Sequence, residues 1–344
     1  MNATSSPVAV SPAATGAAEP SSLAPVSADA AEVGSAPTSA AQALTARADW
    51  LAWRRGGVGG SDIGALLGLS RYASPWSLWA DKVGLLPPDP TSERQQIGHD
   101  FEPVLGQIFA RRTGLHVVGE QTTCKHRDLD WARCTVDGFV ERPEWGVIEG
   151  TVQYKTDARW SWDGIPPAIR AQCQWEMGVT QSPRCWLVVL HGGFSVDVHE
   201  LEFDRSDWEF MLARAGTFWR DHVQTGVPPD VDGSDATTDA MASVWGQHAA
   251  GGAVDLDEMG ESLAARARLK STIKLLSDEV DQIDNEVRAQ LGAAEFGTVG
   301  GEVRATWRTQ PGRTTTCDAC GHSEVGAPSR RLTYRTPKPR SLND

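Results

Sequence analysis

The chain has 344 residues, enough for one substantial core with appendages, and a formal net charge of −13, which is unusual for a protein that binds nucleic acid. Hydrophobic residues make up 40% and charged residues 22%, and we find no apolar run of 18 residues that would span a membrane. Six cysteines without a signal peptide predict reduced thiols in a cytosol rather than a secreted disulfide framework. We therefore expect a cytoplasmic protein.

The charge is spread unevenly along the chain. Acidic residues concentrate between positions 227 and 300, whereas basic residues prevail in 301–344 and form pairs at Arg54-Arg55 and Arg111-Arg112. Duplex DNA needs Lys and Arg to replace its counterions, so the net charge argues against a DNA enzyme. A narrow basic channel in an otherwise acidic protein would still allow DNA binding despite the negative net charge.

The N-terminal part divides into a tail and the start of the core. Residues 1–44 are rich in Ala, Ser and Pro and predict a disordered tail, with the folded part beginning near Thr45 in an aromatic-rich helix. A glycine-rich turn then follows Arg54 and leads into a helix, with Ser61 or Asp62 as its N-cap. Such a turn either binds phosphate through its N–H groups, with Arg54 and Ser61 beside it, or is a bare turn.

Helical and strand patterns alternate through the middle of the chain. Apolar residues recur at helical spacing over 96–112, 165–179 and 206–224, and Glu102 on the first helix would face the sheet. Alternating or β-branched runs predict strands at 115–123, 131–140, 147–156 and 185–203. This order predicts an α/β core over 45–226 with a mixed central sheet flanked by helices.

The C-terminal third is an extension of that core. We expect a linker over 227–254 with Trp245 as a docking point, a helical segment over 255–295, and a short β extension in the basic stretch 296–344. The helical segment carries a heptad-like repeat, which could form a hairpin, pack on the core or pair between subunits, and we favour packing within the chain. The repeat comprises Leu269, Ile273, Leu276, Val280, Ile283, Val287 and Leu291.

A C-x-x-C motif lies in the basic extension. Cys317 and Cys320 supply two thiolates that suit Zn²⁺, and His322 is near enough to be a third ligand. No second C-x-x-C is present, so the choice between a zinc half-site and a free-thiol loop stays open.

Three residues predict a metal-dependent site that cleaves phosphodiesters. Asp137 precedes Gln153 and Lys155, and residues 153 and 155 on one strand point to the same face. Mg²⁺ prefers oxygen ligands, so Asp137 and Gln153 could hold it while Lys155 reaches a water or the phosphate. The alternative is that these three residues are ordinary polar residues at strand ends with no catalytic role.

Several motifs occur in a defined order around these residues. They are RRGGVGGSDI at 54–63 followed by LLGLSRYASPWSLWADKVG, then GHDFEP at 98–103, VDG at 136–138, QYKT at 153–156 and AQCQWEMGVT at 171–180. In this order, residues 47–225 resemble the YqaJ-type viral recombinase family, which includes phage lambda-type exonucleases. The resemblance implies a restriction-endonuclease-like (PD-(D/E)XK) nuclease fold.

The resemblance also implies roles for individual residues. Glu102 would join Asp137 and Gln153 at the metal, together with the backbone carbonyl of Tyr154. Gln172 would contact the active site, with Gln174 structural, and Arg54 would sense the DNA 5′-phosphate. The family usually has Glu or Asp where this chain has Gln153, which puts metal affinity in doubt. Glu149 could substitute only if Gly150 formed a bulge, and we prefer Gln153.

The resemblance implies a Mg²⁺-dependent 5′–3′ exonuclease, with Mn²⁺ as a substitute, that acts on linear double-stranded DNA ends. It would leave 3′ single-stranded tails for recombination with a single-strand annealing protein, work as a homo-oligomeric ring of three or four subunits, and act in the host cytoplasm if phage-encoded. The alternatives are an endonuclease or flap nuclease of the same fold, and a catalytically decayed DNA-binding protein.

Overall fold

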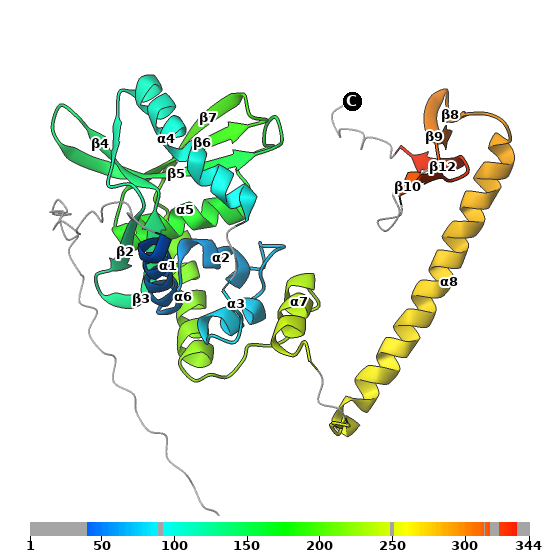
Figure 1. Ribbon diagram of the computed structural model, residues 1–344, viewed down its shortest axis with the longest axis horizontal. Coiled ribbons are helices and arrows are strands. Elements are labelled where there is room, and N and C mark those ends of the chain that lie inside the picture. The colour runs from blue at the N-terminus through cyan, green and yellow to red at the C-terminus, as the bar shows by residue number, and fades with distance from the viewer. Residues whose placement is uncertain (1–39, 89–91, 248–250, 313, 317–322, 336–344) are drawn as a thin grey trace, which may run out of the picture. The chain divides into compact units, whose positions relative to one another are not determined.

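The computed structural model describes residues 40–88, 92–247, 251–312, 314–316 and 323–335 (Figure 1). The chain forms two compact units, residues 1–248 and 249–344. The first unit holds every predicted site residue except the C-x-x-C group. Among the described helices, none has both the length and the apolar character needed to cross a membrane.

A five-stranded mixed sheet forms the centre of the first unit. Its order is β1-β4-β5-β6-β7, and only β5 and β6 run parallel. Helix α5 connects these two parallel strands, as a crossover between parallel neighbours requires. The strands are β1 His116–Val118, β4 Gly138–Arg142, β5 Val147–Asp157, β6 Arg184–His191 and β7 Ser195–Glu202.

A second hairpin leads directly into this sheet. Strands β2 Thr122–His126 and β3 Leu129–Val136 pair antiparallel, and only Asp137 separates β3 from β4. The expected single strand over 131–140 therefore bends at Asp137. Gly138 permits the bend, because a Cβ there would lie 2.4 Å from a side-chain carbon of Val117.

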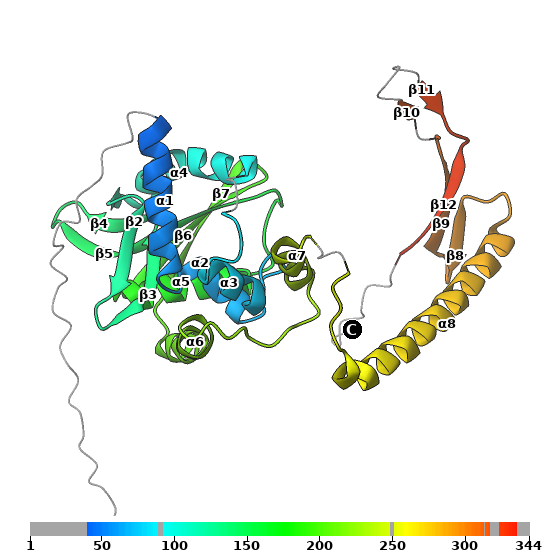
Figure 2. The same ribbon diagram turned by 60° about the horizontal axis from the view of Figure 1, so that its bottom comes forward.

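The two faces of the sheet carry different helices (Figures 1 and 2). Helix α4, Glu93–Thr113, places Leu105 and Phe109 in a buried cluster with apolar residues of β4, β5, β6 and β7. Helix α5, Pro167–Thr180, places Cys173 and Met177 in another cluster with the opposite residues of β6 and β7. Side chains of β5 alternate between these layers, which decides what each residue can reach.

The first unit has further helices, which apart from α1 contribute residues to a third apolar cluster beside α5. They are α1 Ala40–Arg55, α2 Gly60–Leu66, α3 Pro75–Lys82, α6 Arg205–Phe218, the π-helix Trp219–Val223 and α7 Asp235–Val244. Helix α7 lies inside the segment 227–254, where we expected a linker. The Thr237 hydroxyl lies 2.6 Å from Ser74 Oγ, and the Trp245 ring lies 5.6 Å from that of Trp76. Residues 235–245 are therefore packed on α3.

The second unit combines one long helix with short strands. Helix α8 spans Gly260–Leu291 after a 3-10 turn, and β8, β9 and β12 form a sheet in the order β12-β9-β8. Strands β10 Thr314–Thr316 and β11 Ser323–Val325 pair separately. The sheet strands are β8 Phe296–Val299, β9 Glu302–Gln310 and β12 Ser329–Tyr334. Cys317, Cys320 and His322 lie outside the described residues.

Candidate active site

Asp137 is anchored to β5 by two hydrogen bonds. The side-chain amide of Gln153 donates to Asp137 Oδ2 at 2.6 Å, and the Tyr154 N–H donates to the same oxygen at 2.7 Å. Both bonds use Oδ2, so the carboxylate is oriented with Oδ1 directed away from β5. The bend between β3 and β4 thus brings Asp137 to the strand that carries the Q-Y-K motif.

Strand β5 divides its side chains between the two helical layers. Tyr154 belongs to the cluster on the α4 side, whereas Gln153 and Lys155 face α5. Lys155 Nζ donates to Gln172 Oε1 at 3.1 Å, and Gln172 Nε2 lies 3.3 Å from Gln153 Oε1. The structure therefore brings Asp137, Gln153, Lys155 and Gln172 into one hydrogen-bonded network.

Glu176 extends this network by one turn of α5. Gln172 Nε2 also donates to Glu176 Oε1 at 2.9 Å. Glu176 is 1% exposed, its Oε2 atom has no hydrogen-bond partner, and burial raises its pKa well above the ordinary value. Since Glu176 Oε1 accepts, the Gln172 amide must turn its nitrogen to Glu176 and its oxygen to Lys155. Glu176 thereby fixes the orientation of Gln172.

Glu102 approaches from α4, on the other side of the sheet. It lies with Tyr154 and Lys155 in the wall of a cavity of about 300 Å³. Its carboxylate is bound by His99 Nδ1 at 2.9 Å and by Gln121 Nε2 at 2.7 Å. Gln121 also donates its backbone N–H to the Asp137 carbonyl at 3.3 Å, so it links the two candidate acids.

The electrostatics of Asp137 reflect this crowding. Burial raises its pKa to about 6, and the nearby charge of Glu102 acts in the same direction. The Lys155 ammonium and the Tyr154 N–H oppose this rise only in part. A bound divalent cation would relieve the cost of ionising Asp137 at neutral pH, because an opposite charge favours the ionised form.

The oxygen atoms around Asp137 suit a hard cation such as Mg²⁺. Asp137 and Glu102 supply carboxylates, and the Tyr154 carbonyl points toward Asp137 with its N–H, as both groups of a strand residue do. Gln153 presents its amide nitrogen to Asp137, so ligation through its oxygen requires the amide to flip. Among the described residues no group of three or more His, Cys, Asp and Glu could hold a metal, so the ligand set depends on the amide and the carbonyl.

Glu149 does not substitute for Gln153 here. It is paired with Arg142, with distances of 2.5 and 3.1 Å to the guanidinium nitrogens. The β4–β5 pairing does shift register here, because Val140 pairs with Gly150 and Glu141 with Ile148, which leaves Glu149 as the extra residue of a bulge beside Gly150. The Glu149 carboxylate is nevertheless taken up by Arg142.

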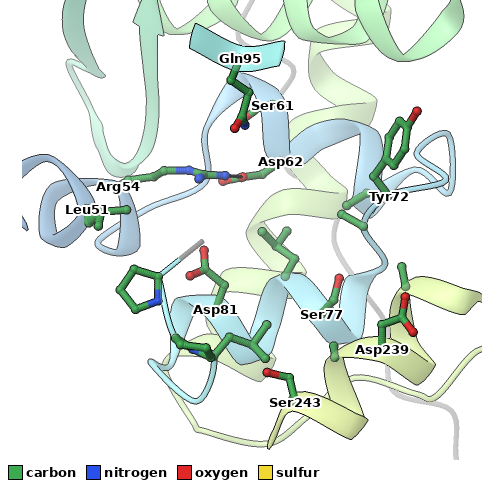
Figure 3. Close-up of a pocket in the computed structure, with 18 of the residues that line it drawn as sticks. Leu51, Arg54, Ser61, Asp62, Tyr72, Ser77, Asp81, Gln95, Asp239 and Ser243 are labelled. Carbon is green, nitrogen blue, oxygen red and sulfur yellow. Dashed lines mark hydrogen bonds and ion pairs between the residues drawn. The ribbon is translucent and has the colours of Figure 1, made fainter. Parts of the chain in front are cut away.

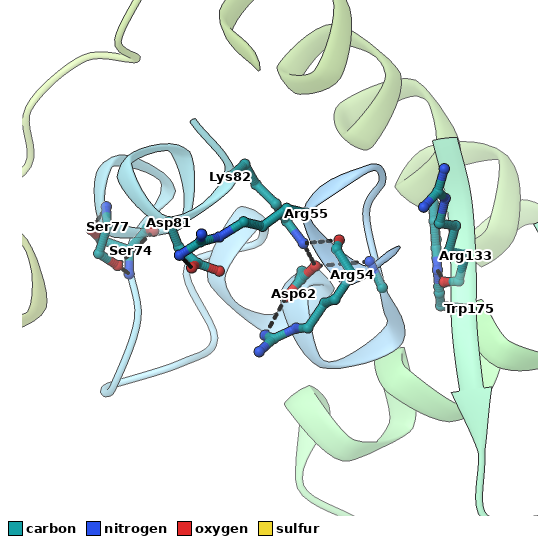
Figure 4. A network of polar contacts seen from close by, with 10 residues as sticks. Arg54, Arg55, Asp62, Ser74, Ser77, Asp81, Lys82, Arg133 and Trp175 are labelled. Carbon is teal, nitrogen blue, oxygen red and sulfur yellow. Dashed lines mark hydrogen bonds and ion pairs between the residues drawn. The ribbon is translucent and has the colours of Figure 1, made fainter. Parts of the chain in front are cut away.

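Arg54 lies in an ion-pair network beneath a larger cavity (Figure 4). It contacts Asp62 Oδ1 at 3.0 Å, and Lys82 contacts Asp62 Oδ2 at 2.6 Å. The Asp62 and Lys82 side chains are 1% and 0% exposed. Burial alone would raise the pKa of Asp62, but Lys82 and Arg54 outweigh it and hold the pKa below its ordinary value.

The glycine-rich turn differs from the phosphate-binding loop that we considered. Gly59, and not Ser61 or Asp62, is the N-cap of α2, and the Asp62 carboxylate accepts its N–H at 2.8 Å. The Val58 N–H donates to the Trp131 carbonyl at 2.7 Å, so it too is engaged. Gly60 instead allows α2 to approach the active site, since a Cβ there would lie 2.9 Å from Glu176 Oε1.

The cavity above this turn has a volume of about 480 Å³ (Figure 3). Arg54 and the exposed Ser61 line it, so a phosphate there would meet side chains rather than the turn's backbone. Gln95 and His99 on α4 line both this cavity and the one beside Lys155. The two candidate sites are therefore neighbours.

Sequence reasoning missed four residues that the fold places here: Asp62 as an ion-pair centre, Lys82, Gln121 and Glu176. Glu176 could have been found, because it lies one helical turn after Gln172. Gln121 could not, because its link to Glu102 depends on a left-handed backbone with φ of 53°, unusual for a residue other than glycine. Gln174 binds the Glu202 carbonyl and the Asp204 N–H, at 2.8 and 2.9 Å, and ties α5 to the end of β7.

Comparisons with known proteins show similarity to one family. Residues 49–183 match the model of the YqaJ-like viral recombinase domain. An uncharacterized protein YqaJ of Bacillus subtilis (strain 168) is 27% identical over 267 residues, which cover 76% of this chain and 83% of that protein.

A solved alkaline exonuclease of Laribacter hongkongensis, LHK-Exo, is 18% identical with a TM-score of 0.44, over 52% of this chain and 94% of that one. The same exonuclease in complex with dAMP is 17% identical, with the same TM-score and coverage. The matched segment contains Arg54, Glu102, Asp137, Gln153, Lys155, Gln172 and Glu176. Residues 49–183 of this chain are therefore similar to the YqaJ-like viral recombinase domain.

Proposed function

We propose that this chain is a metal-dependent deoxyribonuclease that degrades linear double-stranded DNA from its ends, with Mg²⁺ as the cation. One observation carries the proposal: Asp137, Gln153, Lys155 and Gln172 share a single hydrogen-bonded network, and Glu102 and Lys155 line the cavity beside it. An isolated set of polar residues at strand ends would not need this mutual contact. The similarity of residues 49–183 to the YqaJ-like viral recombinase domain supports the same chemistry.

The residues take separate roles in this mechanism. Asp137, Glu102 and the carbonyl of Tyr154 bind the cation, with Gln153 as a neutral ligand after its amide flips. When bound, Mg²⁺ lowers the pKa of a water and stabilises negative charge on the phosphate. Lys155, released from Gln172, orients the attacking water or donates to the scissile phosphate. Gln172, held by Glu176, would position Lys155 beside Gln153.

The neighbouring cavity suits recognition of a DNA end. Arg54 and Ser61 would bind the terminal 5′-phosphate there, and degradation would then run 5′ to 3′ and leave 3′ single-stranded tails. Such tails are the substrate of a single-strand annealing protein, which we propose as the partner. A ring of three or four subunits would keep the enzyme on its DNA.

Digestion of end-labelled DNA tests this proposal. Linear duplexes labelled at the 5′ or the 3′ end are incubated with and without Mg²⁺, beside a closed circular plasmid. We expect Mg²⁺-dependent early release of the 5′ label only, and an intact circle. Asp137→Ala and Lys155→Ala should each abolish digestion, and Lys155→Ala should retain DNA binding. Cleavage of the circle would identify an endonuclease instead.

The contribution of Arg54 is tested separately. Arg54→Ala should reduce initiation on 5′-phosphorylated ends more than on 5′-hydroxyl ends, because it removes a charge-assisted contact. Lys82 would still neutralise Asp62, so the fold should survive the change. An equal loss on both ends would contradict the assignment of Arg54 to the 5′-phosphate.

One observation favours a decayed nuclease as the second candidate. The Gln153 amide faces Asp137 through its nitrogen, an arrangement that satisfies both groups without a cation. A decayed protein would bind DNA ends and digest none of them at any Mg²⁺ concentration, whereas the proposed enzyme digests them.

A further inference from the structure

Helix α8 of the second unit carries an apolar stripe that the other described residues of its unit leave exposed. The five residues of the stripe are each between 51% and 63% exposed: Leu269, Ile273, Leu276, Val280 and Ile283. The sheet of this unit meets α8 only near its C-terminal end, where Tyr334 OH donates to Asp284 at 2.6 Å and Leu291 packs beside Gly297. The packing within the chain that we expected for this repeat is seen at Leu291, which is 8% exposed, and not between the five residues of the stripe and the other described residues of the second unit.

The spacing of the stripe is that of a coiled-coil seam. Its residues alternate at intervals of four and three, which keeps them on one line of a helix pair. In heptad terms Ile273, Val280 and Val287 occupy a positions, and Leu269, Leu276 and Ile283 occupy d positions. A stripe confined to a and d positions is the narrow seam of a coiled coil, which a single facing helix can cover. The occupant that fits this seam is therefore one other helix of the same kind.

The charges of α8 show how that partner must be oriented. The first half of the helix is basic, with Arg266, Arg268, Lys270 and Lys274, and the second half is acidic, with Asp278, Glu279, Asp281, Asp284 and Glu286. The helix dipole does not account for this order, because it acts within the terminal turns, where Glu261 and Arg288 already suit it, and the charges named here lie further inside the helix. Antiparallel pairing would bring each basic half against an acidic half, whereas parallel pairing would bring like charges together.

We propose that α8 forms an antiparallel coiled coil with α8 of a second copy of this chain. In the register that matches a with d positions, Leu269 faces Val287 of the partner, Ile273 faces Ile283, and Leu276 faces Val280. The two-fold symmetry doubles these contacts into six consecutive apolar layers. Lys270 then lies near the acidic Asp284 of the other helix, while a parallel pair would place Glu279 against Asp284. All of these facing residues come from two copies of α8, so no other partner is needed.

Cysteine cross-linking in the full-length chain tests both the pairing and its direction. In the antiparallel register, the double variant I273C/I283C should form a disulfide-linked dimer on mild oxidation, and each single variant should not. Positions 273 and 283 lie about 15 Å apart on one helix, too far for a bond within the chain. A parallel pair would cross-link both single variants. The parent, with its own six cysteines, gives the background.

A matched pair of substitutions distinguishes cross-linking through the paired helices from cross-linking between chains that collide at random. In the I273C/I283C background, Leu276→Asp should reduce the cross-linked fraction at least tenfold. Leu275→Asp should leave it unchanged, because Leu275 is 70% exposed and lies off the seam one residue away. Equal effects of the two changes, cross-linking of the single variants, or no dimer from the double variant would each overturn the proposal. The last outcome would indicate that α8 packs on its own core.

Discussion

Gln153 sets the charge of the candidate site, because it places an amide where a carboxylate would add a negative charge. The metal would then depend on Asp137 and Glu102 for its anionic ligands. Gln153→Glu should lower the Mg²⁺ concentration for half-maximal digestion by about tenfold, which corresponds to ~1.4 kcal/mol of binding free energy. Metal titration of the digestion rate measures this shift.

Gln174→Glu is the matched control for that substitution. Gln174 is 1% exposed on the same helix as Gln172, but it contacts Glu202 and Asp204 instead of the metal ligands. The Gln174→Glu substitution should destabilise the fold without lowering the Mg²⁺ concentration needed for digestion. An unchanged or higher requirement in Gln153→Glu would remove residue 153 from the ligand set.

Because the pKa of Asp137 is raised, we expect the folding stability of the metal-free protein to depend on pH. Its folded-state pKa of about 6 exceeds the ordinary 3.8, so its contribution to stability is full below pH 4 and is lost as pH rises through 6. Asp137→Asn removes this titration and keeps an oxygen for the N–H groups of Gln153 and Tyr154. In chelator at pH 8 the variant should be more stable than the parent by roughly 1–3 kcal/mol.

Thermal unfolding over pH 4–8 in chelator measures that difference. The gain should shrink toward zero at pH 4, where the parent carboxyl is protonated. A variant less stable than the parent at pH 8 would mean that the ionised Asp137 is stabilised by its surroundings even without a cation.

Among the helices and strands, those with a regular apolar pattern could be predicted from the sequence. Helices α4 and α5 and strand β5 were located from their own sequences, because apolar spacing and alternation are local properties. The bend at Asp137 depends on the approach of Val117 to Gly138, and the Arg54–Asp62–Lys82 network joins α1, α2 and α3. Such contacts between segments far apart in the sequence produce no local repeat of apolar residues, so the sequence pattern does not predict them. The ordered motifs indicated which residues belong together, but not the contacts of Glu176 or Gln121.

Helix α7 shows how a short polar helix escapes sequence analysis. Its segment is rich in Asp, Thr and Ser, and only its contacts with α3 reveal that it belongs to the core. Ending the chain after Gly226 should lower core stability by ~2 kcal/mol or more relative to ending after Gln247, because it uncovers Trp76, now 2% exposed, and removes the Thr237–Ser74 bond.

Thermal unfolding of these two shortened chains measures the difference. Thr237→Val in the longer chain provides the control, since it removes only the hydroxyl contact and should account for about 1 kcal/mol of the loss. Equal stability of the two shortened chains would show that α7 adds nothing to the core.

For the whole molecule, almost all of the net charge of −13 lies in the first unit, because residues 1–248 hold 31 acidic and 19 basic residues whereas residues 249–344 hold 14 and 13. Contacts of the first unit with DNA would therefore depend on local basic residues such as Arg54 and Lys155, which line the two cavities. The proposed catalytic site and the proposed pairing helix belong to different compact units. This division predicts that the two activities can be separated by shortening the chain.

A chain ending at Gln247 should digest linear DNA at a rate per chain within about twofold of the parent, since it keeps every candidate site residue from Arg54 to Glu176. It should lose the α8-dependent assembly, seen by light scattering as a smaller mass than that of the parent. Asp137→Ala in the full chain is the complementary variant, inactive but assembled as the parent is. If the shortened chain folds yet digests less than a tenth as fast, the second unit or the assembly that it mediates takes part in catalysis, and the division of labour between the units is wrong.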